Sequence, residues 1–121
     1  MNSRAYRENR LPLLLSLLFA LVPPAAGADV SALIADGDSN YSQRADGHLG
    51  ARARPEPIQQ AIDAYTAALE SDPESLEARW KLLRALYFQG EFVLDNDDER
   101  LALFERGREI ADIGRKQIES H

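Results

Sequence analysis

One stripe of small and apolar side chains constrains this chain most, because its spacing fits a helix and does not fit a strand. The stripe recurs every three or four residues, which places all of its members on one helical face. Pro57 suits the first turn of such a helix, where its missing N–H is not needed, and Pro73 follows shortly after its end at Ser71. We therefore predict a helix over 57–71, with a packing face of Ile58, Ala61, Ile62, Tyr65, Ala68 and Leu69.

Three further segments have helical patterns, and none has the alternation of a strand. The first covers about 29–43, although Gly37 and the polar residues 38–40 weaken it. The second runs from a Ser75 N-cap to a stop at Gly90, and the third runs from an Asn96 cap to about Ile118. The pattern predicts an all-α fold with a loop over 45–57, and the last helix has an apolar stripe of Leu101, Phe104, Ala111, Gly114 and Ile118.

Residues 57–92 carry a pattern that resembles the tetratricopeptide repeat (TPR). Small residues flank an aromatic residue in one helix, a turn proline follows, and the next helix carries a leucine and then Gly-x-aromatic. Small side chains let helices approach closely, and the aromatic ring fills the space between them. The small-residue spacing returns 46 residues later. The predicted packing residues are Ala61, Tyr65, Ala68, Pro73, Leu82, Gly90 and Phe92, with Gly107, Ala111 and Gly114 in the later copy.

The TPR resemblance implies an α-solenoid of antiparallel helical hairpins, with about four helices. Repeat arrays usually need about three repeats to be stable, and the pattern accounts for two hairpins. We therefore expect either self-association or a truncated relative of a longer repeat protein. A more distant resemblance is to the periplasmic T component of TRAP-type transporters.

In TPR arrays the first helix of each hairpin lines a groove that binds peptides or partner helices. The positions that the resemblance assigns to that groove are Glu77, Trp80, Arg84, Tyr87 and Phe88. Trp, Tyr and Arg are enriched at the centres of protein interfaces. The plainer alternatives are that Trp80 and Phe88 belong to the core and that Arg84 is a solvated cation.

Residues 1–28 have the pattern of a secretory signal peptide. Arg4, Arg7 and Arg10 precede an apolar run over 11–22, and small residues lead to a cleavage site expected after Ala28. The apolar run is shorter than the roughly 20 residues that a spanning helix needs. We expect a periplasmic or secreted mature domain over 29–121, with no membrane span. Removal of three Arg and one Glu takes the net charge from −6 to −8.

Composition excludes several classes of function. The chain has no cysteine, which excludes disulfides, thiolate metal sites and cysteine nucleophiles. Its acidic balance disfavours nucleic-acid binding, and no catalytic, metal or cofactor motif is present. We therefore expect an exported, non-enzymatic adaptor with a protein or peptide partner. The alternative is a periplasmic small-ligand carrier or transporter accessory protein, with a pocket of Trp80, Leu83, Tyr87 and Phe88.

Overall fold

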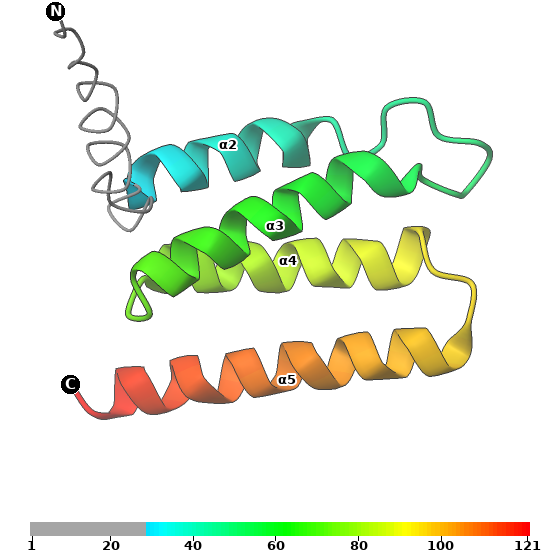
Figure 1. Cartoon of the computed structure of the whole chain (residues 1–121). Coiled ribbons are helices and arrows are strands. Elements are labelled where there is room, and N and C mark those ends of the chain that lie inside the picture. The colour runs from blue at the N-terminus through cyan, green and yellow to red at the C-terminus, as the bar shows by residue number, and fades with distance from the viewer. Residues whose placement is uncertain (1–28) are drawn as a thin grey trace, which may run out of the picture.

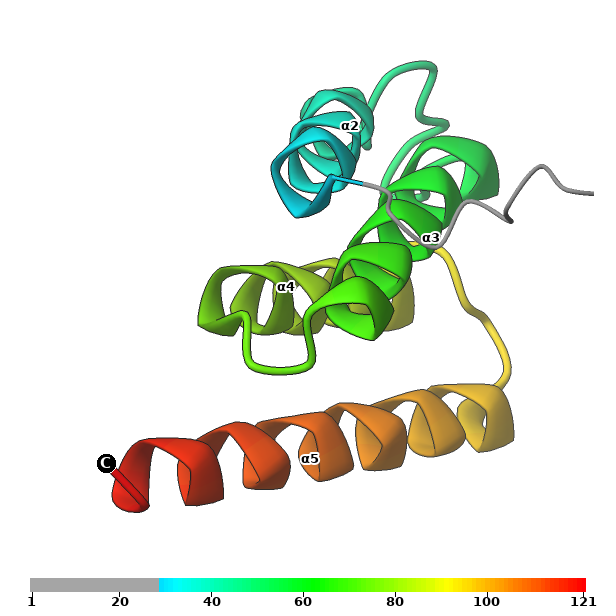
Figure 2. The ribbon, with the colours of Figure 1, turned by 60° about the vertical axis from the view of Figure 1, so that its left-hand side comes forward.

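The computed structural model describes residues 29–121, so the predicted signal peptide lies outside the described residues. Within them the chain forms four helices and no strand: α2 (Val30–Ser42), α3 (Pro55–Ser71), α4 (Leu76–Phe92) and α5 (Asp97–Glu119). The helices lie side by side in chain order, and successive helices run in opposite directions (Figure 1). The all-α prediction is confirmed. After a turn of 60° the four helices keep this order, with α2 and α5 at opposite ends of the stack (Figure 2).

Side-chain caps set the starts of three helices. The Asp29 carboxylate accepts a hydrogen bond from the Ser31 backbone N–H. In the same way, the Ser75 hydroxyl accepts from the Ala78 N–H, and the Asn96 side-chain oxygen accepts from the Glu99 N–H. Each cap satisfies a backbone donor that the first turn of a helix leaves without a partner. The predicted caps at Ser75 and Asn96 are confirmed. Helix α3 begins at Pro55, two residues before the predicted Pro57, because a second proline also suits a first turn.

The core forms where α3 meets its two neighbours, α2 and α4. Tyr65 and Ile58 are the most buried large side chains of α3, and Leu82 and Leu86 are those of α4. Small residues lie between them, which lets the helix axes come close together. The core is completed by Ile34 from α2 and by Ala61, Ile62, Ala68, Ala78 and Ala85.

Gly37 forms the closest approach between α2 and α3. A Cβ atom placed there would lie 2.3 Å from Cε1 of Tyr65, so the fully buried ring occupies the space that a side chain would need. The expectation that Gly37 weakens this helix overlooked that contact. The residue costs helix propensity, but it lets Tyr65 pack against the α2 backbone.

Gly90 does not end its helix, which corrects the prediction of a stop at that residue. Helix α4 continues to Phe92, and Gly90 is buried inside it. A Cβ atom at Gly90 would lie 2.7 Å from the Phe104 ring on α5. The glycine is therefore explained by a close helix contact and not by a chain reversal. Phe92 packs against Phe88, with 4.8 Å between their ring centroids.

The face that α5 turns toward α4 includes only part of the predicted apolar stripe, namely Phe104 beside Gly90 and the buried Gly114. Gly107 lies against Leu83, Gly114 is buried under Arg79, and Leu103 and Ile110 pack against the core. Leu101 and Ile118 from the predicted stripe are instead 58% and 61% exposed. The two glycines allow close approach of the helices, and the larger apolar side chains are left beside the contact line.

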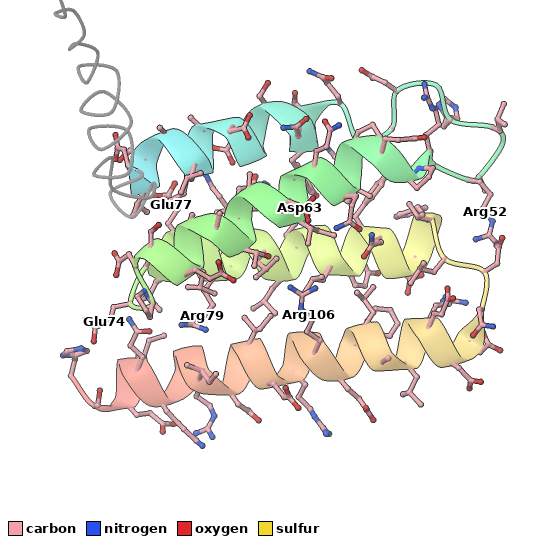
Figure 3. All side chains as sticks on the ribbon, in the orientation of Figure 1. Arg52, Asp63, Glu74, Glu77, Arg79 and Arg106 are labelled. Atoms are coloured by element: carbon pink, nitrogen blue, oxygen red, sulfur yellow. The ribbon has the colours of Figure 1, made fainter. Side chains whose placement is uncertain are left out.

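The connection over 43–54 is fixed to the turn between α4 and α5. The Ala53 N–H donates to the Phe92 carbonyl at 2.9 Å, and Arg52 donates to the Leu94 carbonyl at 3.1 Å. Arg52 also forms an ion pair with Asp95, and it is seen at that end of the stack in Figure 3. This loop therefore covers one end of the helices. At the opposite end, Gln117 of α5 donates to the Glu74 carbonyl in the turn between α3 and α4 at 2.6 Å.

Candidate functional site

The five predicted groove residues lie along one side of α4, and their exposure differs. Trp80 and Tyr87 are 49% and 61% exposed, and Glu77 is also exposed. Arg84 and Phe88 are half-buried. Trp80 is the only tryptophan in the chain. Its side chain separates two surface features, a polar cluster toward α2 and an apolar groove toward α5.

On the α2 side, Arg84 is held by aromatic rings. Its guanidinium carbon lies 3.7 Å from the centre of the Tyr41 ring and 4.9 Å from that of Trp80. Arg44 lies over Tyr41 at 4.2 Å, and Phe88 packs edge-on to Tyr41 with 6.4 Å between centroids. The negative face of an aromatic ring attracts a cation placed over it, so these rings stabilise the guanidinium groups in their positions. Phe88 therefore takes part in the contact between α2 and α4.

Asp38 is the polar centre of this α2–α4 contact. It accepts from the Tyr65 hydroxyl at 2.6 Å and from the Lys81 ammonium at 2.7 Å. Burial opposes the charge on Asp38, but these two hydrogen bonds outweigh it and hold the pKa of the carboxyl below its ordinary value. Burial and the adjacent carboxylate raise the pKa of Tyr65. The arrangement joins α2, α3 and α4 through one carboxylate.

Lys81 is neutralised on both sides, whereas Arg84 is not. Glu77 lies 2.9 Å from Lys81 and Asp38 lies 2.7 Å away. Burial disfavours the charge on Lys81, but hydrogen bonds to these two carboxylates raise its pKa. Within residues 29–121 no carboxylate lies at ion-pair distance from Arg84, and its buried Nε has no hydrogen-bond acceptor. The charge of Arg84 helps to lower the pKa of Asp38, but Arg84 forms no direct ion pair with that carboxylate, so its guanidinium can still pair with an acidic group.

The apolar groove, hereafter the α4–α5 groove, runs between these two helices beside Trp80. It has a volume of about 570 Å³. Arg79 lies between the two helices (Figure 3) and donates to the carbonyls of Pro73 at 2.6 Å and Ile110 at 3.3 Å. These bonds use two of its guanidinium nitrogens, while its buried Nε has no acceptor. The exposed wall surface is mainly apolar, and the Arg115–Glu119 ion pair also lines the groove. The apolar walls are formed by Leu76, Trp80, Leu83, Ala111 and Ile118.

The predicted site residues are only partly brought together. Trp80 and Arg84 adjoin each other, and Ala111 lines the α4–α5 groove where the sequence pattern assigned it to packing. Asp38, Tyr41 and Lys81 were not predicted. The one signal in the sequence that could have indicated Asp38 is its position directly after Gly37, within a segment with a helical pattern. The remaining packing residues Ala61, Tyr65, Ala68, Leu82, Gly90 and Gly114 are buried, Gly107 is half-buried, and Pro73 lies in the exposed turn before α4.

Within 29–121, no three His, Asp or Glu side chains gather as ligands for a metal ion. No helix of the same residues has the length and apolar character needed to cross a membrane. Comparison with protein-family models, with curated proteins and with solved structures finds no match to this chain. The TPR resemblance therefore stays a prediction, and the two surfaces beside Trp80 are the features of the molecule that point to a function.

Proposed function

We propose that this chain is an exported, non-catalytic adaptor of TPR-like design that binds a protein or peptide partner. The observation that carries the proposal is the exposure of Trp80 between the apolar α4–α5 groove and the unpaired Arg84. Trp and Arg are the residue types most often found at the energetic centre of protein interfaces. An exposed apolar surface bordered by polar groups is typical of such interfaces.

A binding role is also supported by the way the titratable groups are used. Asp38, Tyr65 and Lys81 have shifted pKa values, but each satisfies another across a helix contact. Groups paired in this way stabilise packing, whereas a catalytic acid or base must reach a substrate. Of the four side chains expected in a carrier's pocket, Trp80 and Leu83 line the α4–α5 groove, and Phe88 packs on Tyr41. This distribution favours the adaptor over the carrier.

The adaptor proposal is tested by capture of partners from the exported fraction with photo-crosslinking. The variant Trp80→Ala with Arg84→Ala is expected to lose most of the captured protein. The matched control, Leu49→Ala with Arg54→Ala, removes an exposed apolar residue and an exposed Arg from the 43–54 loop and should keep it. Urea denaturation establishes that both variants fold. Unchanged capture by a folded double variant would contradict the proposal.

Export has its own test. Mass spectrometry of the protein from the exported fraction should give Asp29 as the first residue, because cleavage is expected after Ala28. Retention of residues 1–28 on all of the exported protein would contradict the cleavage prediction.

A further inference from the structure

The first helices of the two hairpins correspond residue by residue at an offset of 46. Asp29 caps α2 and Ser75 caps α4, so position 34 in α2 matches Trp80, 38 matches Arg84 and 41 matches Tyr87. Ile34 is buried and Tyr41 is half-buried, whereas Trp80 and Tyr87 are about half and more than half exposed. Helix α4 helps to cover α2, and no helix in residues 29–121 covers α4 in the same way.

The contact of α4 with α2 and α3 shows which kind of helix fits such a surface. Toward α3 it presents small and leucine side chains, all of them buried. Toward α2 it presents Lys81, which binds Asp38, and Arg84, which stacks on Tyr41. The buried side chains of this face are Ala78, Leu82, Ala85 and Leu86.

The exposed side of α4 carries the opposite charge to the matching side of α2. Arg84 stands on α4 where Asp38 stands on α2, and the lysine that satisfies Asp38 has no counterpart there. Arg84 makes no direct ion pair within residues 29–121, although its charge helps to lower the pKa of Asp38, and its Nε is buried without an acceptor. A helix that covers α4 as α4 covers α2 would therefore carry an acidic residue where α4 carries Lys81. Ion pairing that is partly shielded from water favours such a match.

A second copy stacked head to tail does not supply that helix. In that arrangement α2 of the second copy would occupy the groove. The residues that it would place there are those that match the buried face of α4 at the 46-residue offset. The counterparts of Leu82 and Leu86 in α2 are Asp36 and Asn40, both polar. Burying such groups against an apolar groove without hydrogen-bond partners is unfavourable.

We infer that the α4–α5 groove, together with Tyr87 and Arg84, docks an amphipathic helix of a partner protein, with an alanine–leucine face and an acidic residue opposite Arg84. This inference rests on the adaptor proposal and specifies the chemistry of the partner. The apolar face covers Leu76, Trp80 and Ile118, as expected for a helix that binds in a groove. The acidic residue fixes its register along α4.

The probe is a synthetic peptide with the sequence of residues 75–92, in which Trp80→Ala leaves the protein's own Trp80 as the only tryptophan. One version also carries Lys81→Glu, and the control version keeps the lysine. Titration followed by Trp80 emission should show a blue shift and about tenfold tighter binding of the glutamate peptide. In the Arg84→Gln protein the two peptides should bind about equally. Equal binding to the wild-type protein would overturn the inference.

A second arrangement removes the uncertainty of helix formation in a short free peptide. Each of the two peptide sequences is fused in turn to the protein after His121, through a copy of the Asp72–Ser75 turn. The fusion raises the effective concentration of the helix at the groove. The glutamate version should protect Trp80 from acrylamide and raise the urea midpoint above that of a Gly/Ser tail of equal length. Unchanged quenching and midpoint would overturn the inference.

Light scattering measures the oligomeric state and so tests whether a second copy of the chain occupies the α4–α5 groove. A monomer with exposed Trp80 is expected, and a dimer whose Trp80 becomes quenchable on dilution would overturn the assignment to a partner helix. Failure of the inference is distinguishable from failure of the adaptor proposal. If Trp80→Ala with Arg84→Ala abolishes partner capture but neither helix docks, the adaptor stands and the helical partner is wrong.

Discussion

Gly37→Ala is expected to destabilise the fold, although the same change usually strengthens a helix. Alanine is favoured over glycine inside a helix by about 1 kcal/mol. Here the new Cβ would lie 2.3 Å from Cε1 of Tyr65, whose ring is fully buried and whose hydroxyl donates to Asp38 at 2.6 Å. Overpacking costs about 1–3 kcal/mol and a lost hydrogen bond to a charged group about 1.5–3 kcal/mol. After the helix gain, the net loss should be about 1.5–5 kcal/mol.

The assay is urea denaturation followed by circular dichroism, with Gly107→Ala as the matched control. A Cβ at Gly107 would meet Leu83 at 3.7 Å, an ordinary contact, so that variant should gain up to about 1 kcal/mol. In a Tyr65→Ala background, Gly37→Ala should also become neutral or stabilising, because the Cδ1, Cε1 and Cζ atoms that block it are gone. A Gly37→Ala protein at least as stable as the wild type would refute this account of the α2–α3 contact.

Two further outcomes follow from the structure. Asp38 has a depressed pKa in the folded state, so its contribution to stability is present above its unfolded pKa of about 3.9 and is lost as the pH falls through the lower folded value. As the pH is lowered, the urea midpoint should therefore fall less for Asp38→Asn than for the wild type, and parallel curves would contradict this role. Gly90→Ala should cost up to about 2 kcal/mol, because its Cβ would lie 2.7 Å from the Phe104 ring and overpacking of about 1–3 kcal/mol is offset by a helix gain of about 1 kcal/mol. Phe104→Ala should turn the same change into a gain, and a Gly90→Ala variant more stable than the wild type in the same urea assay would count against the α4–α5 contact.

Helix positions were predictable because they depend on local signals. Ser75 and Asn96 are caps whose effect is confined to the next three residues. The buried face of α3 was likewise evident from its spacing, since its members recur with the period of a helix. These features need no knowledge of which helix packs on which.

The roles of the glycines were not predictable in the same way. A glycine late in a helix pattern fits a stop as well as a close contact, and only the position of Phe104 shows that Gly90 makes a contact. Gly37 likewise depends on Tyr65, which is 28 residues away in sequence. The stripe predicted for α5 was only partly correct, because it included the exposed Leu101 and Ile118 and left out Leu103 and Ile110, which pack against the core. The Asp38–Lys81 pair joins residues that are far apart in sequence and has no local pattern.

The order of the helices in the stack has a consequence for local opening. Substantial packing occurs between α2 and α3, α3 and α4, and α4 and α5, so α5 depends mainly on α4. Local unfolding follows such boundaries. Loss of α5 would expose one side of α4 and leave the Tyr65–Asp38–Lys81 connection in place. Amide hydrogens should therefore exchange first in α5 and last in α3, which keeps both of its neighbouring helices when α5 opens.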